Sequence, residues 1–291
     1  MPLDKLTIIG AGLLGSSIGL AARARGLARR VSALVRRPES LAECQALGIA
    51  NEVTLDPVEA VACADLVVLC TPISGMAGLA KRMLPDLKPG TVITDVGSTK
   101  QQLVAELTPL CAGAGARFVG SHPMAGSDQT GPSAARADLF DGTVCVVTPT
   151  SDTDADALAT VNDFWAGLGS RPVIMPADTH DRLVARCSHL PHLLASALAG
   201  RVLDPAHGEQ QAQLCATGFR DMTRLAAGSP VMWRDIVGSN RDDILAAIDE
   251  FADELDQLRG LIAGDSPETI EAWLQRAKLA RDNWNNSSDA D

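Results

Sequence analysis

Apolar residues follow two different spacings in the two parts of the chain. Up to about residue 176, short runs rich in Val, Ile and Leu alternate with stretches of 3.6-residue periodicity, for example over 13–26 and 39–47. Strands that alternate with helices favour a parallel sheet covered by helices on both faces, although the shorter spacers after residue 117 allow a mixed sheet there. The strands that these runs predict lie at 5–9, 31–35, 66–70, 91–95, 117–120, 143–148 and 171–175.

Beyond residue 176 the pattern is helical throughout. Pro191 falls inside the first helical stretch, where it removes a backbone N–H and crowds the carbonyl of Cys187, so we expect a kink there. We expect Asp178 to cap the start of this helix. The fold class is therefore α/β with a doubly wound sheet over residues 1–176, followed by an all-helical domain over 177–291. The helices are predicted over 178–202, 205–227, 231–262 and 266–284.

Charge and composition narrow the range of partners. The 291-residue chain has a formal net charge of −11 at pH 7 and only 3% aromatic residues, which argues against nucleic acid and anionic membranes as partners. The seven cysteines are scattered and form no CxxC pair, so we expect no disulfide framework, no metal site and a reducing, cytoplasmic location. No apolar run approaches ~20 residues and the start of the chain is unlike a signal peptide, so no membrane span is expected.

A glycine-rich turn follows the first predicted strand. Strand 5–9 leads into Gly10-Ala11-Gly12-Leu13-Leu14-Gly15, a G-x-G-x-x-G pattern that opens a helix. In this pattern the first glycine allows the tight turn, the second lets a pyrophosphate approach the backbone, and the third lets helix and strand pack closely. The alternative is a turn without a ligand. The residues that we assign to this Rossmann dinucleotide site are Gly10, Gly12, Leu13, Leu14, Gly15 and Thr71, which follows strand 66–70.

The residues after the second predicted strand bear on the choice of cofactor. An NAD site usually has an acid about 20 residues beyond the glycines, where it binds the ribose 2′-hydroxyl. That count from Gly15 reaches Val35, and two arginines, Arg36 and Arg37, follow in place of an acid. A 2′-phosphate would meet two cations and no repelling carboxylate, so we expect a preference for NADP, with NAD possible. The alternative is that both arginines belong to a solvated turn.

Three polar clusters stand where chemistry is expected. The first, DVGSTK at 95–100, follows a strand, and the second, GSHPMAGSD, occupies 120–128. Because ligands bind at the carboxyl ends of strands in such sheets, these two clusters should line the cofactor crevice. The third cluster is spread over the helical region, as SHLPH at 188–192, GFRDMTR at 218–224 and MWRD at 232–235.

These motifs, in this order, resemble those of the prephenate/arogenate dehydrogenase family. The resemblance extends from Leu6 to about Ile244 and includes GxGxxG, DxGSxK, GSHPMAGSD, SHLPH, GFRDMTRLA and MWRDI. It implies an N-terminal Rossmann domain and a C-terminal helical domain that forms a homodimer. It also implies the oxidative decarboxylation of prephenate to 4-hydroxyphenylpyruvate, or of arogenate to tyrosine, in tyrosine biosynthesis with NAD or NADP.

The resemblance implies roles for two residues at the reacting carbon. Hydride leaves C4 of the substrate ring while the 4-hydroxyl loses its proton, and a histidine suits the base because its pKa lies near neutrality. His122 matches the catalytic histidine of the family, and Ser98 matches the serine that hydrogen-bonds the hydroxyl. The alternatives are a histidine that caps a turn and a structural Gly-Ser turn.

Substrate carboxylates require fixed cations, which the resemblance places on the helical domain. Arg224 matches the arginine that binds a carboxylate, a task that its bidentate fork suits. Asp221 lies three residues earlier on the same helix face and is expected to orient that arginine by an ion pair. His192 and Trp233 match residues of the substrate pocket, and His189 flanks the same helical turn, with core packing as the alternative for all three. We assign the remaining His180 and His207 to the surface.

The preference between the two substrates depends on an acid beside the side chain, because arogenate carries an ammonium group where prephenate has a ketone. Asp128 follows the catalytic loop and is a candidate partner for that ammonium; Ser127 is assigned to the substrate site with it. The two residues could equally cap the next helix. With the NADP assignment, Asp128 favours arogenate, and dual specificity stays open.

Two other functions fit parts of the pattern. A β-hydroxyacid or 6-phosphogluconate-type dehydrogenase shares the plan of a Rossmann domain with helices, but that class usually employs a lysine base on the helical domain, and no lysine occurs between residues 101 and 277. A non-catalytic NADP sensor would not need His122, Ser98 and Arg224 together. Since the helices reach almost to the end of the chain, we expect no regulatory domain of ~80 residues and no mutase-like segment before Leu6.

Overall fold

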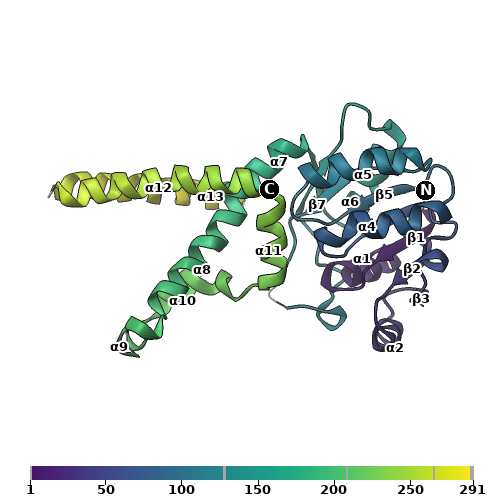
Figure 1. Ribbon diagram of the computed structural model, residues 1–291, viewed down its shortest axis with the longest axis horizontal. Helices are drawn as coiled ribbons and strands as arrows, with labels where there is room; N and C mark the ends of the chain where they lie inside the picture. The colour runs from purple at the N-terminus through teal and green to yellow at the C-terminus, as the bar shows by residue number, and fades with distance from the viewer. Residues whose placement is uncertain (1, 127–128, 208, 265, 289–291) are drawn as a thin grey trace. The chain divides into compact units, whose positions relative to one another are not determined.

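The computed structural model describes residues 2–126, 129–207, 209–264 and 266–288 (Figure 1). The chain forms two compact units that are divided after Arg241. The first unit contains the strands together with the helices up to residue 239, and the second consists of two long helices. The division into domains after residue 176 stays a prediction, because the helices that follow it belong to the first compact unit.

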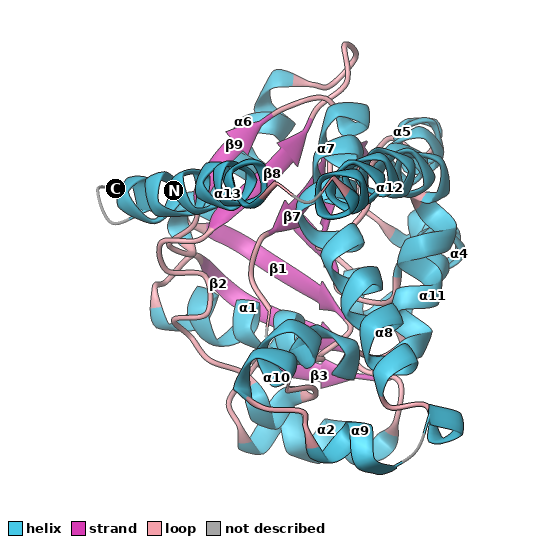
Figure 2. Ribbon diagram, turned by 90° about the vertical axis from the view of Figure 1, so that its left-hand side faces the viewer, coloured by secondary structure: helices cyan, strands magenta, loops and turns pink. Residues whose placement is uncertain are grey.

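The strands form two sheets, as Figure 2 shows. The larger sheet is parallel throughout, in the order β3-β2-β1-β4-β5-β6. In the smaller sheet β7 and β8 are antiparallel, while β8 and β9 are parallel. The strands are β1 (Leu3–Ile9), β2 (Ala28–Leu34), β3 (Glu52–Thr54), β4 (Leu66–Leu69), β5 (Val92–Asp95), β6 (Arg117–Phe118), β7 (Gly120–Pro123), β8 (Val144–Thr148) and β9 (Arg171–Ile174).

The helices follow the expected alternation and then, among the described residues, continue without strands. The first unit contains α1 (Leu13–Ala24), α2 (Pro38–Ala46), α3 (Pro57–Val61), α4 (Ile73–Met83), α5 (Gln101–Gly113), α6 (Ala155–Gly167), α7 (Ala177–Val184), α8 (Leu190–Val202), α9 (Glu209–Gln213), α10 (Thr217–Thr223) and α11 (Pro230–Ser239). The second unit contains α12 (Arg241–Ala263) and α13 (Pro267–Ser288). Among the described residues, no helix is both long and apolar enough to cross a lipid bilayer.

Buried side chains cover both faces of the larger sheet, which confirms the predicted class of fold. On one face, Leu6 and Ile8 of β1 pack with residues of α1 and α6. On the other face, Ile9 packs with residues of α3, α4 and α5. Alternate residues of one strand thus enter two cores, as a strand covered on both sides requires.

The structure departs from the expected elements at two places in the sheets. The run 117–120 is divided between β6 and β7, which belong to different sheets, so the chain passes from the parallel to the mixed sheet at Val119. The pattern also missed β3, which has three residues and begins at the exposed Glu52. A strand this short presents no apolar run, and its place at the sheet edge needs none.

The first long helical stretch is interrupted. Between α7 and α8 the backbone forms a π-helical turn, η3 (Ala185–His189), and Pro191 lies in the first turn of α8. A proline has no N–H to offer the carbonyl of Cys187, and a π-helical turn is one way for a helix to absorb that loss. Asp178 does not cap α7 as expected: the cap position is Pro176, and Asp178 accepts instead from the amide of Thr179 at 2.6 Å.

Candidate active site

The glycine-rich turn has the geometry that close approach of a dinucleotide requires. Gly10 has φ +102°, which favours glycine, and Gly12 forms the N-terminal cap position of α1 without a capping side chain. A Cβ on Gly15 would collide with the carbonyl oxygen of Gly10, so glycine is needed for the packing of α1. A Cβ on Gly12, in contrast, would meet no protein atom within 4 Å. The space beside Gly12 is therefore open at the helix N-terminus, where anions bind.

The surroundings of this turn fit a dinucleotide. Thr71 contacts Gly10, since a Cβ built on Gly10 would lie 3.0 Å from Thr71 Cγ2. The hydroxyls of Thr71 and Ser16 are buried and have no hydrogen-bond partner within the part of the chain that the structure describes. A buried hydroxyl without a partner is costly, and a ligand would satisfy it. Leu13 and Leu14 are half-buried at the start of α1.

The two arginines lie at the end of β2, close to the glycine turn. The amide of Gly10 donates to the carbonyl of Leu34 at 3.0 Å, which holds the end of β2 beside the turn. Val35 is buried, whereas Arg36 and Arg37 are exposed. Both guanidinium groups can therefore reach solvent, or a bound phosphate, on this side of the turn.

A buried ion pair connects the loop that carries Ser98 to the strand that carries His122. Lys100 forms an ion pair with Asp95, and both side chains are fully buried. Lys100 Nζ also donates to the Ser121 carbonyl at 2.9 Å, while Asp95 accepts from the Ser121 amide at 3.0 Å. The amide of Gly97 donates to the same carboxylate at 2.7 Å. These contacts connect the half-buried Ser98, between Gly97 and Lys100, to the residue directly before His122.

His122 lies on β7 and contacts a second histidine. Its Nδ1 is 2.9 Å from Nε2 of His180 on α7, and the two rings meet edge to face. His180 Nδ1 lies 2.7 Å from Oδ1 of Asp181, whose carboxylate also accepts from the backbone amides of Lys100 at 2.7 Å and Gln101 at 2.8 Å. His180 is 1% exposed, so its assignment to the surface was wrong. The helical periodicity of 178–202 did not show that this face of α7 packs against the sheet.

Burial keeps His122, His189 and His192 neutral at pH 7. Burial lowers the pKa of His122 well below its ordinary value, and the neighbouring His180, Lys100 and His189 lower it further. Burial also lowers the pKa of His189 to about 4, although Asp181 partly opposes the shift, and it lowers the pKa of His192. Neutral imidazole is the form that can accept a proton.

His189 presents an unsatisfied donor. Nδ2 of Asn240 donates to the Asp181 carbonyl at 2.9 Å and lies 3.2 Å from Nδ1 of His189. Because this amide nitrogen is a donor, His189 Nδ1 accepts, and the proton of the neutral ring is on Nε2. That Nε2 is buried without a partner among the described residues. A ligand that accepts a hydrogen bond would satisfy it.

Two of the candidate histidines, His189 and His192, contact Trp233. The ring of His192 stacks on Trp233 with centroids 3.5 Å apart, and His189 meets the same indole edge-on. Gly228 lies close to His192 and Trp233, since a Cβ on Gly228 would lie 2.7 Å from His192 Cε1. Arg224 opens the short helical turn η5 (Arg224–Ala227) just before this glycine, and its side chain is exposed.

The candidates thus fall into groups. The Lys100–Asp95 pair connects the loop of Ser98 to the strand of His122. Hydrogen bonds connect His122 through His180, Asp181 and Asn240 to His189. Asp221 is exposed on α10. Ser127 and Asp128 lie outside the described residues, as does the side chain of His207.

Sequence reasoning missed four residues of this network. They are Asp95, Lys100, Asp181 and Asn240, of which the first two stood inside the DVGSTK motif. A lysine five residues after a strand-ending acid was the available signal, but only the fold shows that Asp95 and Lys100 are both buried.

Comparisons with known proteins find similarity to one family over most of the chain. Family models described as the nucleotide-binding domain and the dimerization domain of prephenate dehydrogenase match residues 18–174 and 176–276. A cyclohexadienyl dehydrogenase of Zymomonas mobilis is 35% identical over 278 residues, which cover 95% of this chain and 94% of the relative.

Solved structures show the same likeness. A prephenate dehydrogenase of Aquifex aeolicus, in complex with hydroxyphenyl propionate and NAD⁺, superposes with a TM-score of 0.91 at 30% identity over 97% of this chain and 99% of that one. An arogenate dehydrogenase of Synechocystis gives a TM-score of 0.83 at 28% identity over 96% and 99% of the two chains. The similarity therefore includes both the sheets and the helices.

One open glycine, Gly12, and one closely packed glycine, Gly15, allow a matched test of the nucleotide site. Gly12→Ala should leave the thermal unfolding temperature unchanged, because the new methyl group meets no protein atom, but should weaken binding of the nicotinamide cofactor roughly tenfold or more. Gly15→Ala should instead destabilise the fold by about 1–3 kcal/mol, because its methyl group clashes with the backbone. Calorimetry of unfolding and of cofactor binding checks both. Unchanged cofactor affinity in Gly12→Ala would refute this position for the pyrophosphate.

Proposed function

The chain belongs to the prephenate dehydrogenase family, and we propose that it catalyses the oxidative decarboxylation of arogenate, prephenate or both. The observation that carries this proposal is the environment of His122. The neutral imidazole of His122 lies on β7 of the smaller sheet, where the Lys100–Asp95 pair connects its strand to the loop of Ser98. Hydrogen bonds also connect His122 to His189, which contacts Trp233. A base, a cofactor site and a pocket for an aromatic precursor are what this reaction requires.

His122 would take the proton of the 4-hydroxyl. The bound nicotinamide supplies the acceptor for the hydride of C4, and the electron pair of the breaking bond to CO2 completes the aromatic ring. The ring of His122 is suited to the proton because it is neutral at pH 7. Ser98 is proposed to hydrogen-bond the same hydroxyl, since the buried pair of Lys100 and Asp95 holds its loop beside the strand of His122.

The helical residues would hold the rest of the substrate. The unsatisfied Nε2–H of His189 suits a carboxylate or carbonyl oxygen, and the stacked rings of His192 and Trp233 present a flat surface to a six-membered ring. We propose that Arg224 binds a substrate carboxylate with its bidentate fork. Asp221 is proposed to orient Arg224 from the preceding turn.

We propose NADP as the preferred cofactor. The support is the exposed Arg36 and Arg37 directly after β2, in the place where an acid would otherwise bind a ribose hydroxyl. A 2′-phosphate carries up to two negative charges, which two guanidinium groups can bind bidentately. The site holds a nicotinamide cofactor in either case.

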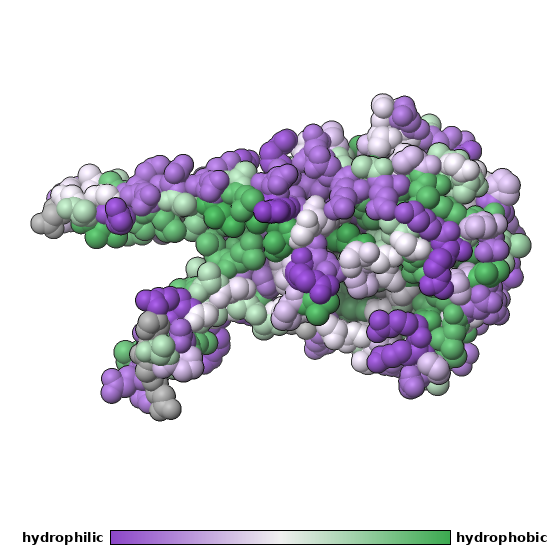
Figure 3. Space-filling model, in the orientation of Figure 1, coloured by the Kyte–Doolittle hydropathy of each residue, from purple (hydrophilic) through white to green (hydrophobic). Residues whose placement is uncertain are grey.

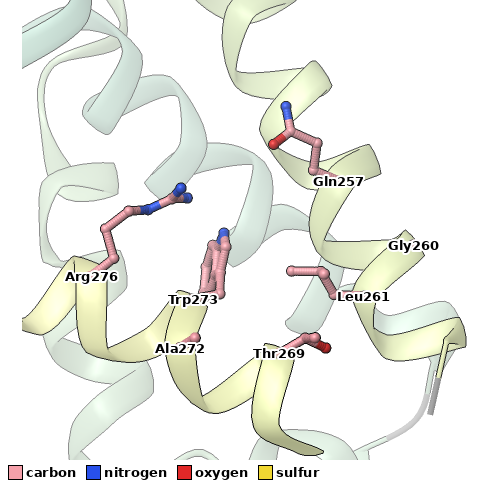
Figure 4. A pocket seen from close by; sticks show the side chains of 7 residues that line it. All are labelled: Gln257, Gly260, Leu261, Thr269, Ala272, Trp273 and Arg276. Atoms are coloured by element: carbon pink, nitrogen blue, oxygen red, sulfur yellow. The ribbon is translucent and has the colours of Figure 1, made fainter. Parts of the chain in front are cut away.

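We also propose a homodimer formed through the helical region. Figure 3 shows apolar residues gathered along the helices of the second unit, where Leu245, Ile248, Leu255 and Ile262 of α12 are exposed. Exposed apolar stripes of this length mark interaction surfaces. Within the same unit, α12 and α13 enclose a pocket of about 490 Å³, lined by Trp273, Leu261 and five further residues (Figure 4). None of the candidate site residues is among its lining.

The activity itself is tested by the His122→Asn variant. The wild-type protein should reduce its cofactor when given arogenate or prephenate, whereas the variant should bind cofactor normally and lose kcat by ~10²-fold or more. The acidic limb of kcat/KM for the wild type should lie below pH 6.5, because the base must be neutral and its pKa lies well below that value. Steady-state rates between pH 5 and pH 8 check this. Full activity of His122→Asn would remove His122 from the mechanism.

The cofactor preference is tested by replacing both arginines. Arg36→Ser with Arg37→Ser should lower kcat/KM for NADP roughly 10- to 100-fold, because a phosphate loses two charge-assisted partners, and should change the value for NAD about twofold at most. Arg82→Ser, an exposed change on α4, is the control for net charge. A wild-type enzyme with a clear preference for NAD would contradict the assignment.

The choice of substrate is tested at Asp128. We propose that this carboxylate pairs with the ammonium group of arogenate. Asp128→Asn should then lower kcat/KM for arogenate roughly tenfold relative to prephenate, because only arogenate carries that charge. The ratio of the two values, measured with one cofactor, is the readout, and an unchanged ratio counts against the role.

A further inference from the structure

His180 and Asp181 form a buried chain of hydrogen bonds behind His122. The chain runs from Asp181 Oδ1 to His180 Nδ1 at 2.7 Å, and from His180 Nε2 to His122 Nδ1 at 2.9 Å. His180 is 1% exposed and Asp181 is fully buried. Neither residue carries a role in the reaction described above, and the buried His180 ring lies between the Asp181 carboxylate and His122.

The direction of the hydrogen bonds follows from the carboxylate. Asp181 also accepts the amides of Lys100 and Gln101, which begin α5, so its oxygens act as acceptors and His180 Nδ1 must be the donor. When the His180 ring carries this one proton, its lone pair is on Nε2, and this nitrogen accepts the Nδ1 proton of His122. The Nε2 of His122 therefore keeps its lone pair.

We propose that His180 and Asp181 are positioning residues that fix the tautomer of His122, so that Nε2 of His122 is the nitrogen that takes the substrate proton. A carboxylate that orients a histidine base through its Nδ1 is the logic of hydrolase triads. Here a second imidazole stands between the carboxylate and the base. The catalytic part of this inference rests on the proposed function, whereas the tautomer does not.

The Asp181 carboxylate also restrains the loop that carries Ser98. Lys100 follows Ser98 by two residues, and its amide is held by Asp181 at 2.7 Å. One buried side chain thus restrains both the ring of His122 and the loop that carries Ser98. This restraint holds His122 and the loop of Ser98 in one arrangement before substrate binds. Such preorganisation supplies much of the rate enhancement of an active site.

The first test needs no substrate. In the histidine-labelled protein, long-range ¹H–¹⁵N NMR at pH 7.5 distinguishes protonated from unprotonated ring nitrogens. We expect His122 to have a protonated Nδ1 and an unprotonated Nε2, with its signals assigned by their loss in His122→Asn. A protonated Nε2 with an unprotonated Nδ1 would overturn the proposal, whatever reaction the protein catalyses.

The second test compares two substitutions of His180 that differ in which partner they keep. His180→Gln places an amide oxygen near the position of Nε2, where it can accept from His122, while His180→Asn can donate to Asp181 but does not reach His122. We expect kcat to fall ~10²-fold in His180→Asn and less than about tenfold in His180→Gln, with KM and cofactor affinity nearly unchanged in both. Equal losses in the two variants, or no loss in either, would contradict the role.

The pH profile separates positioning from general damage to the fold. The groups that face His122 are His180 on α7, Lys100 before α5, with Asp95 paired to it, and His189 on η3. Removing the imidazole of His180 removes one of the causes that lower the pKa of His122, so the acidic limb of kcat/KM should move to higher pH in His180→Gln. An unmoved limb contradicts the proposal. If the wild type shows the expected tautomer but no turnover of either substrate, the proposed function fails and the positioning stands.

Discussion

The structure depends on a charged pair that is completely removed from water. Burying Lys100 and Asp95 costs several kcal/mol for each ion, and the cost is offset only where the remaining hydrogen-bonding groups are satisfied. Here they are, because the Ser121 carbonyl accepts from the ammonium group while the amides of Gly97 and Ser121 donate to the carboxylate. The pair joins the end of β5, the start of α5 and the beginning of β7. It therefore binds the parallel sheet to the smaller mixed sheet at the place where Ser98 and His122 emerge.

Much of the fold followed from the sequence because its signals are local. The apolar runs of β1, β4 and β5 and the glycines before α1 are explained by burial and by backbone geometry within a few residues. The division of 117–120 between two sheets had no such signal, since Val119 is as apolar as its neighbours and only the pairing partners differ. Edge strand β3 was missed for the opposite reason, as it has too few apolar residues to form a pattern.

The site was predictable where a motif contained it and unpredictable where contacts over long sequence distances built it. His122 and Ser98 stood in recognisable motifs, although the structure alone does not assign their roles. His180 was misplaced because a histidine beside an aspartate on a helix resembles a solvated pair, and its burial results from packing of α7 against a strand 58 residues earlier. Asn240 is farther still, 59 residues beyond the Asp181 carbonyl that it contacts. Contacts over such sequence distances give no signal in the local spacing of residues.

The π-helical turn Ala185–His189 has a consequence for how this region tolerates change in length. A π turn holds one residue more than an α-helical turn, so it acts as an insertion already absorbed by the helix. Removing that extra residue would therefore leave the rest of the helix in nearly the same phase, whereas removing a residue between the π turn and His192 would rotate everything beyond it by about 100°. His192 would then leave the indole of Trp233, although no side chain of the site had been altered. The contact between His192 and Trp233 thus depends on the phase of this helix as much as on the two side chains.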